Sequence, residues 1–335
     1  MKEFKMVNKT FIKSNNTTNK IFNRYLYSLI PFILLIIIYN LIWGSNIVII
    51  NLIKSNLISL FTCITTEYIF NLINKKKNNL TFIFEENILT ISIILGLFAI
   101  NSKIFIIIIS GVVSILMKNI LKNTKISSSL YGILIIIIYS YFTKDLNTPL
   151  SNLKELSYID TYSNVLKSYG TITSYIFGLK YYLSPILSIL SFIYLLFKKS
   201  IKYNIVFSYI LTFIVIMLIF GIINNMNIWY LFFQLTTGNI LFLTIFCLPD
   251  YPNTPTTKEG QIIYGIILAI ITSILRFIVP ELSVIISIII GQLLLTKIIN
   301  RISIKLKYNK KYYYLLLLSS LICISITIIL INIII

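Results

Sequence analysis

The sequence contains no histidine among its 335 residues, and it has only three cysteines and ten acidic residues. The absence of histidine excludes a histidine-ligated zinc or haem site and any catalytic relay that depends on imidazole. Cys63, Cys247 and Cys323 lie inside apolar segments, and none belongs to a C-x-x-C pair. Glycine-rich phosphate loops, paired-carboxylate hydrolase patterns and metal-ligand clusters are also missing. These absences argue against a self-contained enzyme of the soluble type.

Charged residues make up only 12% of the chain and hydrophobic residues 57%, which gives a mean hydropathy of +0.91. Such a composition is far from that of a soluble domain and predicts a polytopic membrane protein. The formal net charge is +19, but the basic residues cluster at the ends of apolar runs, where lysines flank membrane spans. We therefore expect a lipid bilayer around the chain and no nucleic-acid partner.

The predicted fold class is all-α, with about eleven transmembrane helices. The apolar runs that carry this prediction lie at roughly 27–43, 52–72, 87–101, 104–117, 129–142, 171–197, 203–223, 229–248, 262–279, 281–296 and 312–335. The third to fifth runs are short, so we expect these spans to be tilted, broken or partly buried in protein.

The basic residues test this span count, because cytoplasmic loops are richer in lysine and arginine than external ones. If the polar leader 1–26 is cytoplasmic, alternation places every basic cluster on that same side, including Lys75–Lys77 and those after residues 117, 197 and 296. The loop 143–170, whose charges balance, falls on the opposite side. The leader precedes a span without a small-residue cleavage site, so we expect a multi-pass protein of the cell membrane with an uncleaved cytoplasmic N-terminus.

One polar stretch, LPDYPNTPTTKEGQIIYG at residues 248–265, interrupts the apolar chain. Pro249, Pro252 and Pro255 prevent helix continuation and fix an extended or turned path. On the span count above, this stretch is a cytoplasmic loop between the eighth and ninth spans. Two interpretations stay open, namely a plain connector and a binding loop with a constrained backbone.

Asp250 is the leading candidate for function in this loop. Together with nearby donors and acceptors it could hold a ring system or polarise a path for a cation, and Gly260 would permit close backbone approach. Those neighbours are Asn253, Thr254, Thr256 and Gln261. The alternative interpretation of Asp250 is a solvated loop acid or a helix cap.

Further polar residues lie in or near the predicted spans. Residues 236–239, TTGN, form a polar patch within the eighth span, where small polar residues serve helix packing or a binding function. Glu67 and Arg276 lie near span ends. Each of these two side chains either snorkels to the interface or contributes to a proton or sodium path.

The segment QLTTGNILFLTIFCLPDYPNTPTTKEGQIIYG, residues 234–265, resembles the C-terminal signature of the RnfD and NqrB membrane subunits of ion-translocating oxidoreductases. Its core, D-x4-P-T-T-x2-G-Q-x-I-Y-G, fits without a gap. The matching positions are Leu235, Gly238, Phe246, Asp250, Pro255, Thr256, Thr257, Gly260, Gln261, Ile263, Tyr264 and Gly265. Weaker similarity, which includes Glu67-Tyr68, Gly111 and Lys118, extends the resemblance over residues 10–301.

The resemblance implies two inverted bundles of five helices, at 27–142 and 171–301, joined by the extracytoplasmic loop 143–170. Residues 302–335 would add one extra C-terminal helix. The resemblance also implies that the chain is at most one subunit of an oxidoreductase complex, with other membrane subunits as partners. Such a complex would couple redox reactions to sodium or proton translocation.

The resemblance breaks down at the flavin-acceptor motif. Family members with covalent flavin carry it on the threonine of a D-x2-S-G-A-T motif; Asp160 and Ser163 match, but Leu166 occupies the acceptor position. Leucine has no hydroxyl to form a phosphoester, so we expect FMN or riboflavin, if bound, to be held noncovalently. The candidate cofactor-binding residues are Asp160, Ser163, Gly238, Asp250, Asn253, Thr254, Thr256, Gly260 and Gln261.

Other family positions have also changed. The F-N-P-A loop becomes Ile126-Ser127-Ser128-Ser129, and the leading histidine of the C-terminal signature is Gln234. These changes keep a second interpretation open, a divergent relative without covalent flavin that acts as a structural or small-solute transport subunit. A third interpretation is an unrelated permease whose loop matches by chance.

Overall fold

The computed structural model describes residues 18–42, 46–73, 87–121, 125–143, 158–172, 183–251 and 253–308. Within these ranges the chain forms helices and no strand. The α-helices are α1 (Thr18–Ile42), α2 (Asn46–Ile73), α4 (Ile88–Phe98), α5 (Ile104–Leu121), α6 (Ser129–Thr143), α7 (Tyr158–Tyr169), α9 (Pro185–Phe197), α10 (Tyr203–Ile223), α11 (Ile228–Thr236), α12 (Ile240–Phe246), α13 (Lys258–Ile278), α14 (Ser283–Ile290) and α15 (Thr296–Tyr308). Three single turns complete the described helices: η1 (Ile126–Ser128), η2 (Thr237–Asn239) and the π-turn η3 (Gly291–Leu295).

The helices confirm the predicted fold class, an all-α polytopic membrane protein. Seven helical stretches are long and apolar enough to cross a membrane, and three shorter apolar helices lie at 88–98, 126–140 and 185–197. Together they overlap the first ten predicted spans, although the sixth is matched only over 185–197 and its residues 173–182 lie outside the described residues. The eleventh predicted span, 312–335, the first 17 residues of the leader and the Lys75–Lys77 cluster lie outside the described residues.

The loop predicted at 143–170 contains a helix, α7, that the hydropathy pattern did not reveal. Its sequence, YIDTYSNVLKSY, is amphipathic rather than apolar, so a search for membrane spans passes over it. α7 packs against α11, where the rings of Tyr162 and Trp229 meet edge to face at 5.6 Å. This part of the connection between the two halves is therefore ordered.

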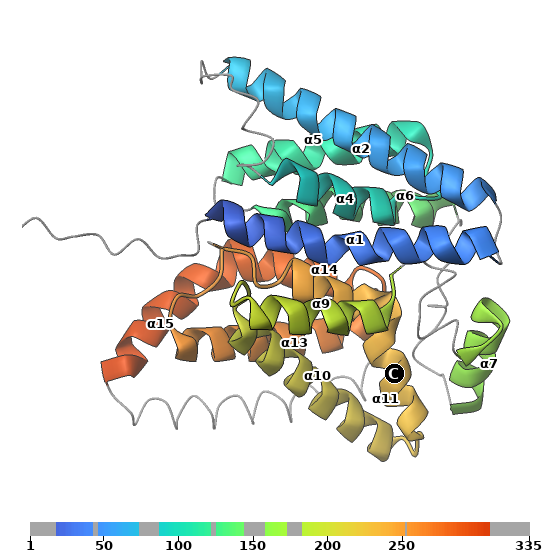
Figure 1. The fold of residues 1–335 in the computed structure, drawn as a ribbon. Helices are drawn as coiled ribbons and strands as arrows, with labels where there is room; N and C mark the ends of the chain where they lie inside the picture. The colour runs from blue at the N-terminus through green and yellow to red at the C-terminus, as the bar shows by residue number, and fades with distance from the viewer. Residues whose placement is uncertain are drawn as a thin grey trace, which may run out of the picture.

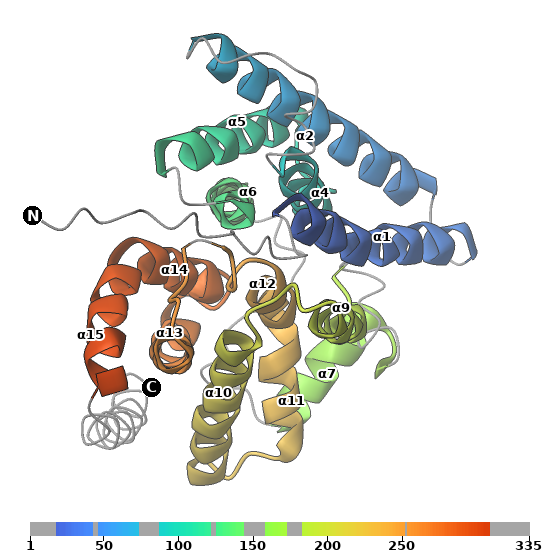
Figure 2. The same ribbon diagram turned by 60° about the vertical axis from the view of Figure 1, so that its left-hand side comes forward.

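The helices divide into two groups along the chain, which Figures 1 and 2 show on opposite sides of the molecule. In the first group, α2 packs against α4 and α5, and α5 packs against α6. In the second group, α10 packs against α11 and α13, and α13 packs against α14. The same order of packing thus recurs in the two halves.

Small residues permit the closest approaches inside each group. Gly111 of α5 lies against Thr62 of α2, and Gly265 of α13 lies against the backbone of α10, where an added Cβ would be 2.7 Å from the carbonyl oxygen of Ile205. Between α2 and α4, the Ser55 hydroxyl donates to the carbonyl of Gly96 at 2.9 Å. Glycine and serine at such positions let helix backbones pack closely where lipid gives no hydrophobic drive for association.

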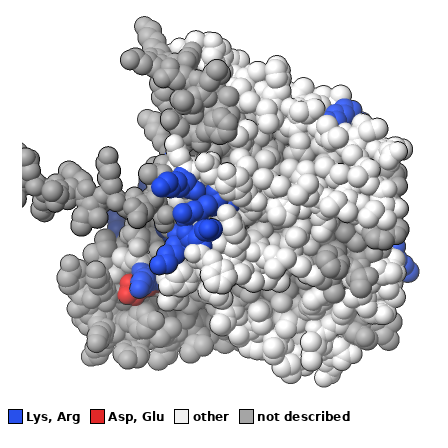
Figure 3. Space-filling view, viewed as in Figure 1, with Lys and Arg blue, Asp and Glu red and all other residues white. Residues whose placement is uncertain are grey.

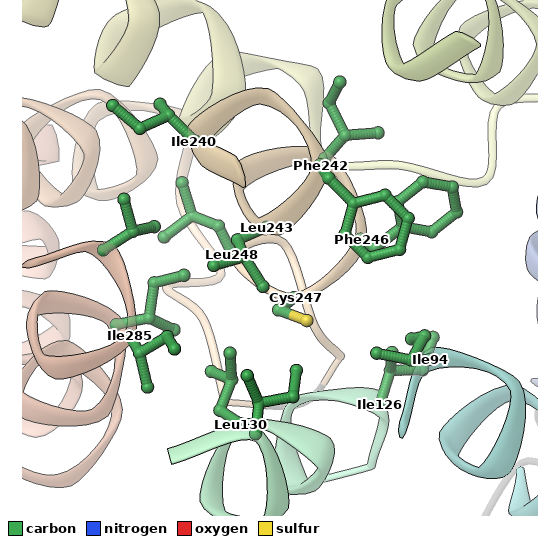
Figure 4. Packing of buried hydrophobic residues seen from close by; sticks show 14 of the residues in the cluster. Ile94, Ile126, Leu130, Ile240, Phe242, Leu243, Phe246, Cys247, Leu248 and Ile285 are labelled. Carbon is green, nitrogen blue, oxygen red and sulfur yellow. The ribbon is translucent and has the colours of Figure 1, made fainter. Parts of the chain in front are cut away.

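Aromatic residues fill the boundary between the two groups. Phe32 of α1 and Phe98 of α4 both meet the ring of Phe242 of α12 edge to face, at 5.3 Å and 5.9 Å. Figure 4 shows residues of α12 packed among Ile94, Ile126 and Leu130 of the first group and Ile285 of the second. α12 is therefore the element at which the two halves share one core. The polar stretch 248–265, which we call the signature loop, follows directly after α12.

Candidate functional site

The carboxylate of Asp250 joins the two halves of the protein. It follows α12, and its Oδ2 accepts hydrogen bonds from the backbone N–H of Lys125 at 2.8 Å and of Ser127 at 2.9 Å, and from the Ser127 hydroxyl at 2.5 Å. These donors belong to the turn that starts η1 and α6. Free N–H groups at a helix start attract an anionic acceptor. Of the two interpretations of Asp250, the helix-cap one describes its contacts, although the cap is formed across the bundle boundary.

Asp250 is buried, and its exposed fraction is only 2%. Burial raises the pKa of this carboxyl, while the hydrogen bonds from Ser127 and from the backbone act in the opposite direction. The second oxygen, Oδ1, is buried without a hydrogen-bond partner among the described residues. One carboxylate oxygen therefore holds the turn, and the other keeps an unused acceptor inside the protein.

Lys202, at the start of α10, also contacts the loop that contains Asp250. Its Nζ donates to the Thr254 hydroxyl at 2.6 Å and the Thr254 carbonyl at 3.2 Å, and it lies 4.3 Å from the centre of the Tyr251 ring. Burial lowers the pKa of Lys202 to about 8, against a smaller raising effect of the Asp250 charge. The Thr254 hydroxyl in turn donates to the carbonyl of Asp250 at 3.1 Å, so Lys202 and Asp250 are linked through one threonine.

Other predicted binding residues hold the loop to the helices. Gln261 donates from Nε2 to the Pro255 carbonyl at 3.2 Å and accepts from Asn204 at 3.1 Å. Gly260 fits closely beside Ser303 of α15, because an added Cβ would lie 3.0 Å from that side chain. These contacts leave little capacity for a ligand on Gln261 and Gly260.

Asn253 and Thr256 are the members of the predicted cluster that face outward. Asn253 is half-buried and Thr256 is exposed. The backbone N–H of Thr256 donates to the Asn300 side chain at 3.3 Å, which ties the loop to α15. Pro252, predicted to constrain this loop, lies outside the described residues.

Four basic residues, Arg24, Lys125, Lys198 and Lys202, lie at the same end of the helices as the loop, and we call them the basic rim. Arg24 of α1 donates to the carbonyl of Lys198 at 2.5 Å, and the Lys125 ammonium lies over the Phe22 ring at 5.1 Å. On the face of the molecule shown in Figure 3, most of the basic residues gather in one patch at the left, and only isolated ones lie at the right. Charge is therefore concentrated at one end of the helices.

Gly238 lies at a break in the eighth span, away from the Asp250 loop. Gly238 has a φ of +66° and Asn239 a φ of +57°, so the helix stops at α11 and restarts at α12. Arg276 of α13 fills the space beside Gly238 and is completely buried. The polar patch at 236–239 is thus a helix break held by an arginine, and the snorkelling interpretation of Arg276 is wrong.

Glu67 is also buried rather than snorkelling. Its Oε2 lies 3.3 Å from the Lys118 ammonium and accepts a hydrogen bond from the Asn119 side chain at 3.0 Å. The pair connects α2 with α5 inside the first group. A charged pair in this position is expensive to bury and is stable only when both partners are present.

The predicted flavin-acceptor stretch lies in α7, at the far end of the helices from the start of α13 (Figure 1). Asp160 belongs to this helix, Ser163 and Leu166 are half-buried in it, and Thr161 is buried. The structure therefore divides the nine candidate residues among three places, α7, the helix break and the Asp250 loop. They do not form one site.

Sequence reasoning missed the partners of Asp250 and of Gly238. Ser127 lies in the stretch that replaces the family's F-N-P-A loop, and a changed motif gave no sign that its backbone still binds the carboxylate. Lys202 was visible only as one of several flanking charges. Gln234 was noted as a substitution, whereas its role beside Arg276 depends on a contact over 42 positions of sequence.

Comparison with known proteins gives a match at family level. The sequence model of the NQR2, RnfD, RnfE family matches residues 5–309, which include every helix described above. No curated protein was found to match the chain.

Proposed function

Because the chain belongs to the NQR2, RnfD, RnfE family, we propose that it serves an Rnf/Nqr-type complex as the membrane subunit that couples electron transfer to sodium or proton movement. The family match over residues 5–309 carries this proposal. Members of this family are subunits of multi-subunit membrane complexes, and the described helices are those of a multi-pass membrane protein. The bilayer and other membrane subunits are accordingly the proposed partners.

Buried acids support a part in ion movement. Glu67 lies inside the first group of helices and Asp250 at the boundary between the groups, both shielded from solvent. Ionisable residues buried in membrane proteins commonly belong to ion pathways or proton relays. Both contacts of Glu67, with Lys118 and Asn119, are made by Oε2, so a proton or a sodium ion would meet a carboxylate that already faces one cation.

Leu166, at the position in α7 expected for the acceptor, offers no hydroxyl for a covalent flavin. A noncovalent FMN or riboflavin remains part of the proposal, and its redox chemistry would come from the isoalloxazine ring. Asn253 and Thr256 are the predicted contacts that face outward, and the basic rim would suit a phosphate group. Asp250, Thr254, Gly260 and Gln261 would shape that position through the loop.

The distribution of charge supports a cytoplasmic N-terminus. The basic rim and the start of α1 lie at one end of the helices, where Arg24 of α1 contacts Lys198. Basic residues favour the cytoplasmic side of a bilayer. We therefore place the signature loop on the cytoplasmic face and α7 on the opposite face.

The test is to purify the protein from its own membranes in its complex and to analyse extracted flavin. Noncovalent flavin in the extract, with no fluorescent protein band on a denaturing gel, is the expected result. A fluorescent band would overturn the exclusion of covalent FMN. An intact, active complex in which this subunit carries no flavin would remove its redox role.

A second function is favoured by Leu166 and by the contacts that already occupy Thr254 and Gln261 within the protein. A subunit that lost flavin would serve as a structural or small-solute transport component. Co-purification separates the two, because a redox subunit should be isolated with other electron-transfer subunits, whereas the alternative predicts isolation without them. Genes for such subunits beside this one would favour the redox function.

A further inference from the structure

The break in the eighth span leaves the end of α11 without the hydrogen bonds that helix continuation would supply. α11 ends at Thr236, the backbone turns through Gly238 and Asn239 in left-handed conformations, and α12 begins at Ile240. The last carbonyl groups of a helix have no partner within the helix. Inside a membrane protein such groups must be satisfied by the protein itself.

Arg276 donates hydrogen bonds to this broken end. Its Nη2 donates to the Thr237 carbonyl at 3.0 Å and to the Thr237 hydroxyl at 2.5 Å, and its Nε donates to Oε1 of Gln234 at 3.1 Å. Its Nη1 donates to the Pro280 carbonyl at 2.9 Å. We call these four atoms the oxygen cage; all are neutral oxygens, and they come from α11, the break and the turn after α13.

The arrangement has the features of a cation site. Half-helix ends with unwound carbonyl groups coordinate cations in transporters with broken helices, and the carbonyl end of a helix carries partial negative charge. Gln234 turns its oxygen toward the guanidinium, and its side chain also interacts with the hydroxyl of Tyr230, which is buried beside it. The Gln234 amide thus presents its acceptor to the positive group.

We propose that Arg276 is a built-in monovalent cation, and that the oxygen cage will bind a free small cation, guanidinium above all, once the side chain is shortened. The tethered guanidinium fixes the break between α11 and α12 in one geometry. It also keeps the cage permanently filled, so that a mobile ion does not pass through this position. The proposal concerns the second group of helices alone and holds whichever complex the chain serves.

Geometry makes guanidinium the preferred occupant. The acceptors accommodate a planar fork whose donors point in fixed directions, and an added Cβ at Gly238 would lie only 3.2 Å from Cζ of Arg276. A spherical ion such as sodium or potassium can reach some of the four oxygens, but it does not have the planar shape that all four acceptors fit. The expected order of binding is therefore guanidinium first, with sodium and potassium weaker.

The test is chemical rescue of Arg276→Ala, measured as the apparent melting temperature of the full-length protein in detergent. Guanidinium chloride up to about 20 mM, far below denaturing concentrations, should raise the melting temperature of this variant along a saturating curve. The wild type should not respond. Adding Thr237→Val to the variant removes one acceptor and should weaken the rescue by about tenfold or more, the effect of losing about 1.4 kcal/mol.

Arg24→Ala is the matched control, because Arg24 also donates to a backbone carbonyl but is only half-buried. It should show no response to guanidinium. The proposal is overturned if Arg276→Ala shows no response, or if wild type and Arg24→Ala respond equally.

The proposal can still be tested if Arg276→Ala does not fold. Membranes that contain the variant can be solubilised with and without about 20 mM guanidinium. Recovery of monodisperse protein only with guanidinium supports the cage, and failure in both conditions contradicts it. Arg276→Lys and Arg276→Gln provide a second measurement, since the cationic variant should melt higher than the neutral one. Equal melting temperatures would show that the charge is dispensable and would overturn the proposal.

Discussion

The two halves of the protein bury positive charge in different ways. In the first group of helices, the ammonium of Lys118 lies 3.3 Å from the carboxylate of Glu67, so that a cation and an anion are buried together. In the second group, the guanidinium of Arg276 donates hydrogen bonds to the four oxygens of the cage. A carboxylate thus faces the buried cation of the first group, whereas carbonyl, amide and hydroxyl oxygens at a helix break accept from that of the second.

The ion pair can exchange its cation, whereas the arginine in the oxygen cage is fixed in place. The ion pair depends on a titratable carboxylate, and the exchange of Lys118 for another cation would leave the helices intact. The oxygen cage includes backbone carbonyls at a helix break, so that movement of Arg276 would disturb the helix itself. We therefore expect ion-linked chemistry in the first group and at the boundary, and a static frame in the second.

The largest effect should come from breaking the ion pair. Lys118→Ala leaves a buried carboxylate without its cation and should cost about 3–5 kcal/mol. The double variant Lys118→Met with Glu67→Gln should recover much of this loss, because no buried charge remains. Apparent melting temperatures in detergent measure both, with the exposed Lys54→Ala on α2 as the control. Equal melting of Lys118→Ala and wild type would show that the pair contributes nothing to stability.

Asp250 tests the contact between the halves. Asp250→Asn keeps the size of the side chain but replaces a charged acceptor that receives three hydrogen bonds, which should cost about 1.5–3 kcal/mol. Glu259→Gln, at the start of α13, should leave stability nearly unchanged. Hydrogen exchange at residues 125–127 gives the more specific measurement. Exchange there should accelerate in Asp250→Asn only. Unchanged exchange would show that the Asp250 carboxylate does not cap this turn.

Gly265→Ala tests the close helix packing in the second group. The new Cβ would lie 2.7 Å from the carbonyl oxygen of Ile205 and 3.0 Å from the backbone nitrogen of Tyr209, which cannot move without the helix. We expect a loss of about 1–3 kcal/mol. Gly221→Ala is the control, because its nearest contact would be an ordinary 3.6 Å. Similar melting of the two variants would contradict the close approach of α10 and α13.

The smallest effect is a change in the reactivity of Lys202. Only the unprotonated amine reacts with acylating reagents, so a pKa lowered to about 8 by burial should give labelling that rises through pH 8. In the denatured protein the midpoint should move to the usual lysine value of about 10.4. Asp250→Asn should shift the folded midpoint below 8, because the Asp250 charge raises this pKa. Mass spectrometry of the Lys202 peptide provides the measurement, and an identical midpoint in folded and denatured protein would refute the burial effect.

The span prediction succeeded where a long apolar run by itself requires a helix. α2, α10 and α13 were predicted because about 20 apolar residues in a bilayer leave the backbone no alternative to internal hydrogen bonds. It failed for α7, whose amphipathic sequence packs on protein and carries no such signal. The break at Gly238 was visible as a polar patch, but a polar patch in a span fits helix packing as well as a helix break.

The candidate site shows the same limit. Sequence identified Asp250 as an important carboxylate and offered a helix cap as one of its roles. It did not identify the capped helix, because Lys125 and Ser127 precede Asp250 by more than 120 positions. Asp160 and Ser163 were grouped with Asp250 by family resemblance, whereas the fold places α7 at the far end of the helices.

The sequence by itself determined the membrane location and the helical fold, because both follow from local composition. The tertiary structure decided which buried charges meet, because hydrogen-bond partners such as Gln234 and Arg276 lie on different helices. Hydropathy records how strongly a segment avoids water. Only packing shows which polar atoms replace that water once the segment is buried.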